Sequence, residues 1–199
     1  RVPLLFNGDV SLAMVNPDRS DEHFYRNGAA DEYTYVAEGE GVLHSQFGQI
    51  PFGPGDQLIV HRGMLHRLEL TSAAAKLLII ESRGYIHLPP RYLTRTGQIV
   101  EGAPLSERDL RLPRDLQTHD ERGEFELIVK QGEGLTRMVL DHHPFDVVGW
   151  DGQYYPWAFS IHDFEPITGA IHQPPPIHQF VEADGWVLCN FCPRPFDFH

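Results

Sequence analysis

The stretch GDQLIVHRGMLHRLEL (residues 55–70) holds two short apolar runs separated by a turn. The first run, DQLIV, is continuously apolar after its first two residues, whereas LHRLEL largely alternates apolar with polar residues. A glycine-containing segment, HRGM, lies between them. Short runs of this kind, bounded by turn residues, are typical of neighbouring antiparallel strands. The stretch therefore predicts two consecutive strands of an antiparallel sheet.

Similar runs recur on both sides of this stretch, and Gly, Pro, Asn or Asp closes each of them. Helical periodicity is confined to SERDLRLPRDL (106–116), where Pro113 limits a helix to a short piece. This spacing predicts an all-β chain folded as an antiparallel barrel or jelly roll. The further strand-like runs are VSLAMVNP (10–17), EYTYVAEG (32–39), GVLHSQFG (41–48), AKLLIIES (75–82), FELIVKQG (125–132), TRMVLDHH (136–143), WAFSIHDF (157–164) and WVLCNFC (186–192).

Composition along the chain changes twice. Residues 1–87 read as a first β unit, and residues 88–124 are charged, contain prolines and lack clear periodicity, like a connector. Strand signals resume over residues 125–199 and predict the beginning of a second β unit. The chain starts at Arg1 and stops directly after a strand-like run, so both ends look like cuts through a longer protein.

The charge balance excludes some classes of partner. Acidic residues outnumber basic residues 28 to 16, for a formal net charge of −12, and this balance repels nucleic acid. No stretch approaches the ~20 apolar residues of a membrane span. The two cysteines, Cys189 and Cys192, lack the second ligand pair of a metal knuckle. Such sparse cysteine suits a reducing compartment and predicts a cytoplasmic location.

The first unit carries parts of the two motifs that hold the metal in cupin barrels, which it resembles. Glu32 is followed by six residues and Gly39, and in the stretch quoted above Gly55 is followed by five residues and then HRGMLH, which ends at His66. Because side chains alternate on strands, Glu32 and His66 are both expected to point into the barrel. The two histidines expected shortly before the glutamate are absent, since FYRNGAAD (24–31) takes their place and His23 lies too far upstream. A facial iron site needs two histidines and a carboxylate, so we expect buried hydrogen bonds here instead.

Several longer strings resemble one family, the homogentisate 1,2-dioxygenases, which are two-cupin, iron-dependent, ring-cleaving enzymes of tyrosine and phenylalanine breakdown. The resemblance runs through nearly all 199 residues and is closest to bacterial members. It implies a first cupin followed by the beginning of a second. The strings are RVPLLFNGDV (1–10), HFYRNGAADEYTYVAEGEGVLHSQFG (23–48), GDQLIVHRGMLHRLEL (55–70), HHPFDVVGWDGQYYPWAFSIHDFEPITG (142–169) and IHQPPPIHQFVEADGWVLCNFCPRPFDFH (171–199).

The resemblance also implies roles for two histidines. The family's general acid/base lies in a segment of the form His-x-x-Pro-x-Ile, and here that role falls on His172, with Pro175 and Ile177 matching. Three consecutive prolines form a rigid, extended mount for this ring. His178, on the far side of the prolines, is a candidate for the substrate pocket.

The cofactor that the resemblance implies is Fe(II), with ligands expected C-terminal to His199, so no metal ligand is assigned within this chain. The implied reactants are homogentisate, or a similar small aromatic acid, and O2, and the implied product is maleylacetoacetate. The family assembles as trimers or hexamers, so a homo-oligomer is expected.

The remaining histidines predict no site. His142 and His143 are adjacent, so on a strand they point to opposite faces, one into the core and one outside. Surface or hydrogen-bonded core roles are expected for the other scattered rings, which are His44, His61, His87, His119 and His162.

Two alternatives to the dioxygenase stay open. In the first, the chain is a metal-free cupin that acts as a binding or structural module. In the second, it is a small cupin enzyme that holds a metal with Glu32, His66 and water. Metal analysis of a Glu32→Ala variant separates the second alternative from the other readings.

Overall fold

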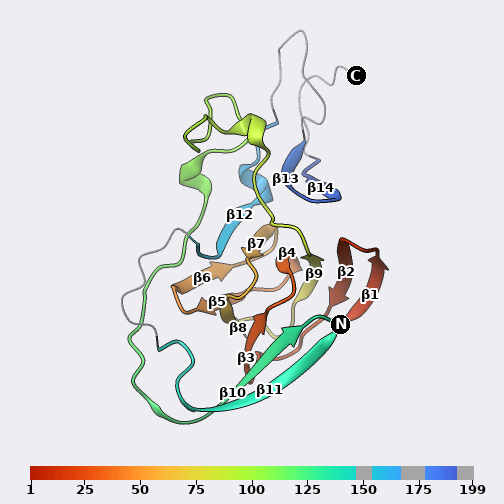
Figure 1. Ribbon diagram of the computed structural model, residues 1–199. Helices are drawn as coiled ribbons and strands as arrows, with labels where there is room; N and C mark the ends of the chain where they lie inside the picture. Colours follow the sequence, from red (N-terminus) through yellow and green to blue (C-terminus); the bar gives the residue numbers. More distant parts are fainter. Residues whose placement is uncertain (147–153, 167–177, 192–199) are drawn as a thin grey trace.

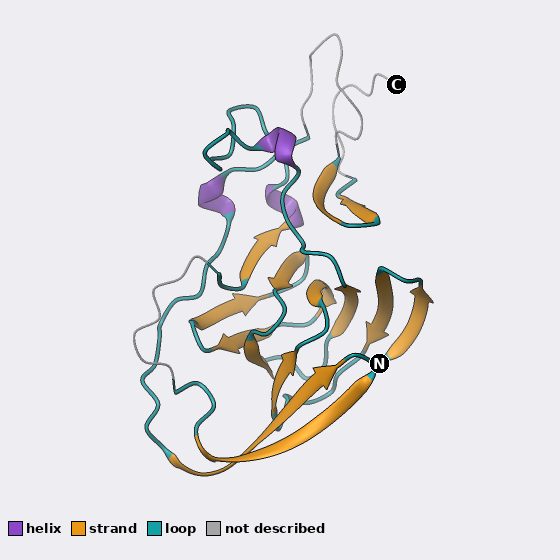
Figure 2. Ribbon diagram, viewed as in Figure 1, coloured by secondary structure: helices purple, strands orange, loops and turns teal. Residues whose placement is uncertain are grey.

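The computed structural model describes residues 1–146, 154–166 and 178–191, and strands make up most of its regular structure (Figures 1 and 2). Two six-stranded sheets pack against each other, and a two-stranded hairpin lies at one end. The first sheet has the order β1 (Val2–Phe6), β2 (Val10–Val15), β9 (Lys76–Ser82), β4 (Asp31–Glu38), β7 (Asp56–Val60) and β12 (Trp157–Ser160). The second has the order β11 (Gly134–His142), β10 (Arg122–Gln131), β3 (Phe24–Asn27), β8 (Leu65–Leu70), β5 (Gly41–Ser45) and β6 (Gly48–Phe52).

Strand β7 explains the continuous apolar run with which the sequence analysis began. All five of its residues are buried, because Leu58 and Val60 pack into the core between the sheets while Ile59 packs into a second core on the outer face. That second core includes Phe159 of β12 and Phe180 of β13 (Gln179–Ala183). A strand covered on both faces cannot alternate apolar with polar residues, and the sequence reflects this.

Strand register determines which polar side chains meet inside the barrel. Tyr25 of β3 pairs with His66 of β8, and Glu32 of β4 pairs with Glu81 of β9. Residues directly opposite on antiparallel strands place their side chains on the same face. The register therefore collects these polar groups toward the interior of the barrel.

Strands from beyond the connector join the sheets of the first unit. β10 pairs in parallel with β3, β12 pairs with β7, and β10 and β11 form a long hairpin that runs along the bottom of the view in Figure 1. The hairpin of β13 and β14 (Trp186–Cys189) forms a separate two-stranded sheet, which packs through Phe180 into the second core. The domain boundaries at residues 87 and 124 stay predictions, although strands on both sides of them share sheets.

The all-β antiparallel prediction is confirmed, and each strand-like run of the sequence analysis contains a strand. The one predicted helical segment is a single 3-10 turn, η2 (Glu107–Asp109), as Pro113 required. The other short turns are η1 (Pro90–Tyr92) and η3 (Ile161–Asp163). The sequence analysis did not delimit β1, β3, β6 and β13, which are short and adjoin turns or prolines. Across the described residues, none of the helical turns has the length and apolarity of a membrane span.

Candidate functional site

A cavity of about 500 Å³ lies between the two sheets. Aliphatic side chains form much of its lining, namely Val15, Leu43, Leu58, Val60, Leu68, Leu70, Leu77 and Ile79. Several polar side chains also line it, among them Tyr25, Glu32 and His66 from three strands and Arg1 from the N-terminal segment. A largely apolar cavity with a few convergent polar groups is the usual form of a small-molecule site.

Glu32 and His66 both face this cavity, as their strand positions predicted. The carboxylate of Glu32 accepts hydrogen bonds from Asn27 Nδ2 at 2.9 Å and from the Tyr25 hydroxyl at 3.3 Å. His66 Nδ1 donates to the backbone carbonyl of Met64 at 3.2 Å, and its Nε2 lies 3.7 Å from Glu32 Oε2. The expected buried hydrogen bonds are therefore present.

The phenol of Tyr25 stays protonated in this environment. Burial, together with the charge of Glu32, raises the pKa of Tyr25 well above its ordinary value. The hydroxyl therefore acts as a hydrogen-bond donor to Glu32 across the whole physiological pH range. Arg1 adds a charge interaction, with its guanidinium 3.8 Å from the Glu32 carboxylate.

These residues do not fit the iron centre of a ring-cleaving dioxygenase. Strand β3 supplies Tyr25 and Asn27 where cupin motifs carry histidines, and both donate to Glu32 instead of binding a cation with it. His23 lines the same cavity, but within the described ranges it does not approach Glu32 and His66 closely enough for the three to share one ion. A carboxylate with one imidazole is an incomplete facial set.

A second ionic group, centred on Glu81 of β9, includes Arg1 and Lys130 from the cavity lining. Glu81 accepts from Arg1 Nη1 at 2.6 Å and from Lys130 Nζ, on β10, at 2.5 Å. Burial alone would raise the pKa of Glu81, but the hydrogen bond from Lys130 and the charge of Arg1 outweigh burial and hold that pKa below its ordinary value. Glu32 and Glu81 are thus each paired with neighbouring side chains, and aliphatic side chains form much of the cavity surface.

Asp31 and His61 form a buried pair that the sequence analysis did not predict. His61 Nδ1 donates to Asp31 Oδ2 at 2.8 Å, and the backbone N–H groups of Arg62 and Ile86 donate to the same carboxylate at 2.8 and 2.9 Å. Burial would raise the pKa of Asp31, but these hydrogen bonds lower it below the ordinary value. Only 4% of His61 is exposed, so this pair joins strands rather than facing a substrate.

His178, the candidate for the substrate pocket, lies at the base of the β13–β14 hairpin. Its Nδ1 donates to the carbonyl of Asn190 at 3.0 Å, and the Asn190 N–H donates back to the His178 carbonyl at 2.7 Å. The ring is buried and packs against Phe191, with centroids 4.9 Å apart. These contacts fix the ring orientation, while its substrate role stays a prediction. His172 lies outside the described residues.

Three metal-ligand side chains that the sequence analysis left apart come together at the open end of the β10–β11 hairpin. One donor atom each from His119, Glu121 and His143 lies within 4.8 Å of the others, and this is the one such group of three among the described residues. The expectation of a surface or core role for His119 on its own was incomplete. A His-x-Glu pair directly before a strand was the available signal.

The adjacent histidines, both of intermediate burial, make different contacts. His143 packs among aromatic rings, and its Nδ1 accepts the N–H of Phe145 at 3.1 Å. His142 points elsewhere, since its Nδ1 donates to Asp141 at 2.9 Å and its side chain is 42% exposed. Burial and the neighbouring His119 lower the pKa of His143.

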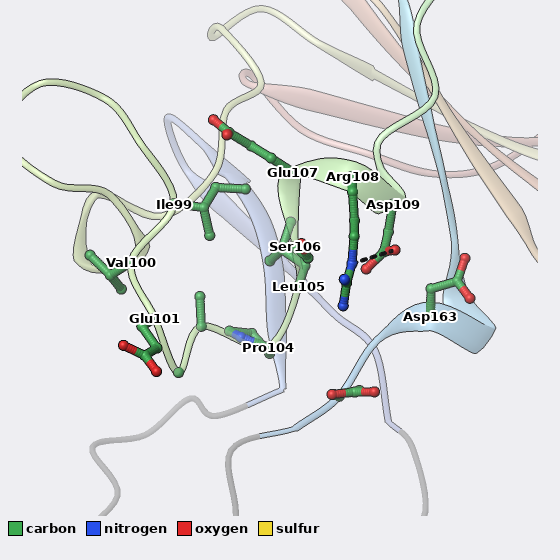
Figure 3. Close-up of a pocket in the computed structure, with 13 residues that line it drawn as sticks. Ile99, Val100, Glu101, Pro104, Leu105, Ser106, Glu107, Arg108, Asp109 and Asp163 are labelled. Atoms are coloured by element: carbon green, nitrogen blue, oxygen red, sulfur yellow. Dashed lines mark ion pairs between the residues drawn. The ribbon is translucent and has the colours of Figure 1, made fainter.

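A further cavity, of about 390 Å³, lies between the connector and the segment that carries Asp163 and Glu165 (Figure 3). Its charged lining consists of Arg108, which lies 3.9 Å from Asp109, and a larger number of carboxylates. These carboxylates belong to Glu101, Glu107, Asp109, Asp163 and Glu165. An excess of negative charge repels an aromatic acid, so this cavity is a poor candidate for such a substrate.

Two largely antiparallel sheets that enclose a cavity, with Glu32 and His66 directed inward from neighbouring motifs, define a cupin-type domain. The family profile described as "Homogentisate 1,2-dioxygenase N-terminal" matches residues 9–161. The chain therefore belongs to the homogentisate 1,2-dioxygenase N-terminal family.

Relatives agree with this assignment. A protein of Saccharolobus solfataricus, provisionally described as a dioxygenase, is 44% identical over 200 residues, which cover 100% of this chain and 51% of that protein. The homogentisate 1,2-dioxygenase of Nitrobacter hamburgensis is 34% identical over 162 residues, or 80% of this chain and 34% of that enzyme. The chain thus spans between about a third and a half of the length of these relatives.

Solved structures with a similar arrangement include a cupin-2 domain protein from Shewanella frigidimarina, at 20% identity and a TM-score of 0.36. The match covers 41% of this chain and 79% of that one. A cupin superfamily protein from Desulfitobacterium hafniense matches at 18% identity and a TM-score of 0.37, over 41% of this chain and 73% of that one. Likenesses at these scores carry no functional argument.

Proposed function

We propose that this chain is the N-terminal part of an oxygenase that cleaves the ring of homogentisate, or of a closely similar aromatic acid, with O2. The family match over residues 9–161 carries this proposal. The product would be maleylacetoacetate, and the pathway would be tyrosine and phenylalanine breakdown. The oxygenase would act in the cytoplasm as a homo-oligomer, a trimer or hexamer by resemblance.

In this proposal the first barrel is a scaffold and does not hold the catalytic metal. Its carboxylate, Glu32, is already occupied by Asn27 and Tyr25, and its single nearby imidazole, His66, is bonded to a backbone carbonyl. The ferrous ion, which would activate O2, would be held by residues C-terminal to His199. The described residues therefore supply the scaffold on which the catalytic part is mounted.

His172 is proposed as the general acid/base of this reaction. A histidine titrates near neutral pH, so its ring would accept the proton of a substrate phenol as the substrate binds and return a proton later. Loss of the phenolic proton raises electron density on the ring, which favours attack by oxygen. A rigid proline mount suits this role, because misplacement by about 1 Å costs on the order of a hundredfold in rate.

His178 is proposed to contact the substrate. Because Nδ1 donates to the Asn190 carbonyl, the neutral ring presents its other nitrogen, Nε2, as a hydrogen-bond acceptor. An acceptor of fixed orientation suits a substrate that carries phenolic O–H groups. The buried position of the ring would hold this acceptor in place.

A second candidate function is a metal-free cupin module that binds a small apolar molecule. The observation that favours it is the cavity of about 500 Å³, which has many aliphatic side chains in its lining and a carboxylate, Glu32, that is already paired with neighbouring side chains. In that case the full-length protein would bind a ligand in the first barrel without chemical turnover.

Oxygen uptake separates these functions. Full-length protein reconstituted with Fe(II) should consume O2 when homogentisate is added and should form maleylacetoacetate, detected by its absorbance. Phenylacetate, which lacks both ring hydroxyls, is the matched control and should give no uptake. Absence of turnover with homogentisate and with other hydroxylated phenylacetates would contradict the proposed dioxygenase and favour the binding module.

A further inference from the structure

We propose that His119, Glu121 and His143 form a second metal site, which binds a divalent ion of the zinc class outside the barrel. The three donors are two imidazoles and one carboxylate, and they lie within 4.8 Å of one another. Imidazole and carboxylate donors suit zinc and its neighbours in the first transition series, whereas calcium and magnesium prefer oxygen donors alone.

Strand geometry explains why these three side chains meet. Arg122 and His142 are the last registered pair of the β10–β11 hairpin, and the N–H of His143 donates to the carbonyl of Glu121 at 3.0 Å, which extends the pairing by one step. Side chains directly opposite on antiparallel strands share a face. His119 precedes Glu121 by two residues, so in an extended segment it lies on the same face.

The contacts within the group hold the donors close together. The His119 and His143 rings stack, with centroids 3.7 Å apart and planes 6° from parallel. His119 Nδ1 lies 3.2 and 3.3 Å from the two carboxylate oxygens of Glu121. His143 is anchored from behind by Phe24 and Phe125, with both ring-centroid distances at 5.1 Å.

Metal binding requires one rearrangement of this group. The nitrogen lone pairs lie in the ring planes, so stacked rings do not aim at a common point until one ring turns about its Cβ–Cγ bond. That torsion is broad for histidine, and the side chain of His119 is partly exposed at 21%, which leaves it free to turn. His143 would give up its hydrogen bond from Phe145, whichever of its nitrogens binds the ion.

This site differs from the proposed ring-cleavage centre. The cavity adjoining His119 has a volume of about 20 Å³, which admits a water molecule and not an aromatic acid. Glu121 and His143 flank the hairpin, while His119 belongs to the end of the connector. An ion bound here would therefore fasten the connector to the hairpin and stabilise the fold without taking part in turnover.

The experiment uses full-length, iron-loaded protein and titrates Zn²⁺ or Co²⁺ alone, with bound metal measured by elemental analysis after gel filtration. Wild type should bind one equivalent more than H119Q and H143Q, and E121Q should bind it at least tenfold more weakly. H142Q is the matched control, because His142 adjoins the site and is bonded to Asp141 instead. It should bind as wild type does.

Thermal unfolding gives an independent measurement. Zn²⁺ should raise the Tm of wild type and H142Q by a few degrees and leave that of H119Q and H143Q unchanged. Iron content and oxygen uptake should be equal in wild type, H142Q, H119Q and H143Q. A failure of the second metal site can therefore be distinguished from a failure of the proposed dioxygenase activity. Zn²⁺ binding with the same stoichiometry and affinity in every variant would overturn the site. A loss of Zn²⁺ binding in H142Q as large as that in H119Q and H143Q would also overturn it. If H143Q is unstable without metal, H119Q decides.

Discussion

The buried carboxylate of Asp31 accepts a hydrogen bond from the imidazole of His61 at 2.8 Å, across 30 positions of sequence. The His61 ring lies between Tyr85 and Tyr154, with centroid distances of 4.7 and 4.9 Å. Two backbone N–H groups, from Arg62 and Ile86, also donate to Asp31. One side chain thus joins the start of β4, the turn after β7 and the segment after β9.

Asp31→Asn should destabilise the fold by roughly 2–4 kcal/mol, because an amide cannot accept from all three donors and leaves buried N–H groups without partners. The free energy of unfolding in urea measures this effect. Asp18→Asn, at an exposed position, is the matched control and should change it by less than about 0.5 kcal/mol. A loss as small as this for Asp31→Asn would contradict the role of the pair.

The same carboxylate should make stability depend on acid pH. The pKa of Asp31 is lowered on folding from about 3.8, so its contribution is complete above that value and is lost as pH falls through the lower folded pKa. The difference in unfolding free energy between wild type and Asp31→Asn should therefore shrink as pH drops from about 5 to 3. A difference that stays constant over this range would show that Asp31 does not contribute through its charge.

Glu81 and Lys130 should prove energetically coupled. Both side chains are largely buried, and their ion pair joins β9 of one sheet to β10 of the other. A double-mutant cycle with Glu81→Gln and Lys130→Met should give a coupling energy of about 1–2 kcal/mol in urea unfolding. The exposed pair of Arg19 and Glu22, both about four-fifths exposed, is the comparison and should give less than about 0.5 kcal/mol. Strictly additive effects of the first two substitutions would exclude the coupling.

Glu32→Ala should leave the iron content of the full-length protein unchanged. The substitution removes the acceptor for Asn27 and Tyr25, so the unfolding free energy should fall by about 1–3 kcal/mol. Elemental analysis and urea unfolding of the same preparation measure both effects. Loss of stoichiometric iron in the folded variant would support the alternative in which Glu32 and His66 hold a metal.

His172→Asn in the full-length protein should slow turnover of homogentisate by at least about a hundredfold, as expected on removal of a general acid/base. Iron content should remain close to that of the wild type, because this ring is not proposed as a ligand. His87→Asn is a suitable control, since His87 is bonded to the Leu88 carbonyl in the first unit. Turnover of the His172 variant at the wild-type rate would remove this residue from the proposed mechanism.

Much of the fold was predictable because its signals are local. The run LIV (58–60) is continuously apolar since both faces of β7 are covered, and glycines and prolines mark most of the strand ends. The position of Glu32 and His66 inside the barrel followed from the alternation of side chains along β4 and β8. Short strands such as β6, which contains Pro51, gave no comparable signal and were missed.

By itself, the sequence determined the all-β class, the family and the incompleteness of the first-barrel metal motif, because strand periodicity and motif spacing are properties of short segments. Only the tertiary structure decided which polar groups meet. The pairing of Asp31 with His61, of Glu81 with Lys130, and of His119 with His143 depends on strand register and sheet packing across 24 to 49 positions. Such contacts are set by the burial of the whole chain, and no local pattern encodes them.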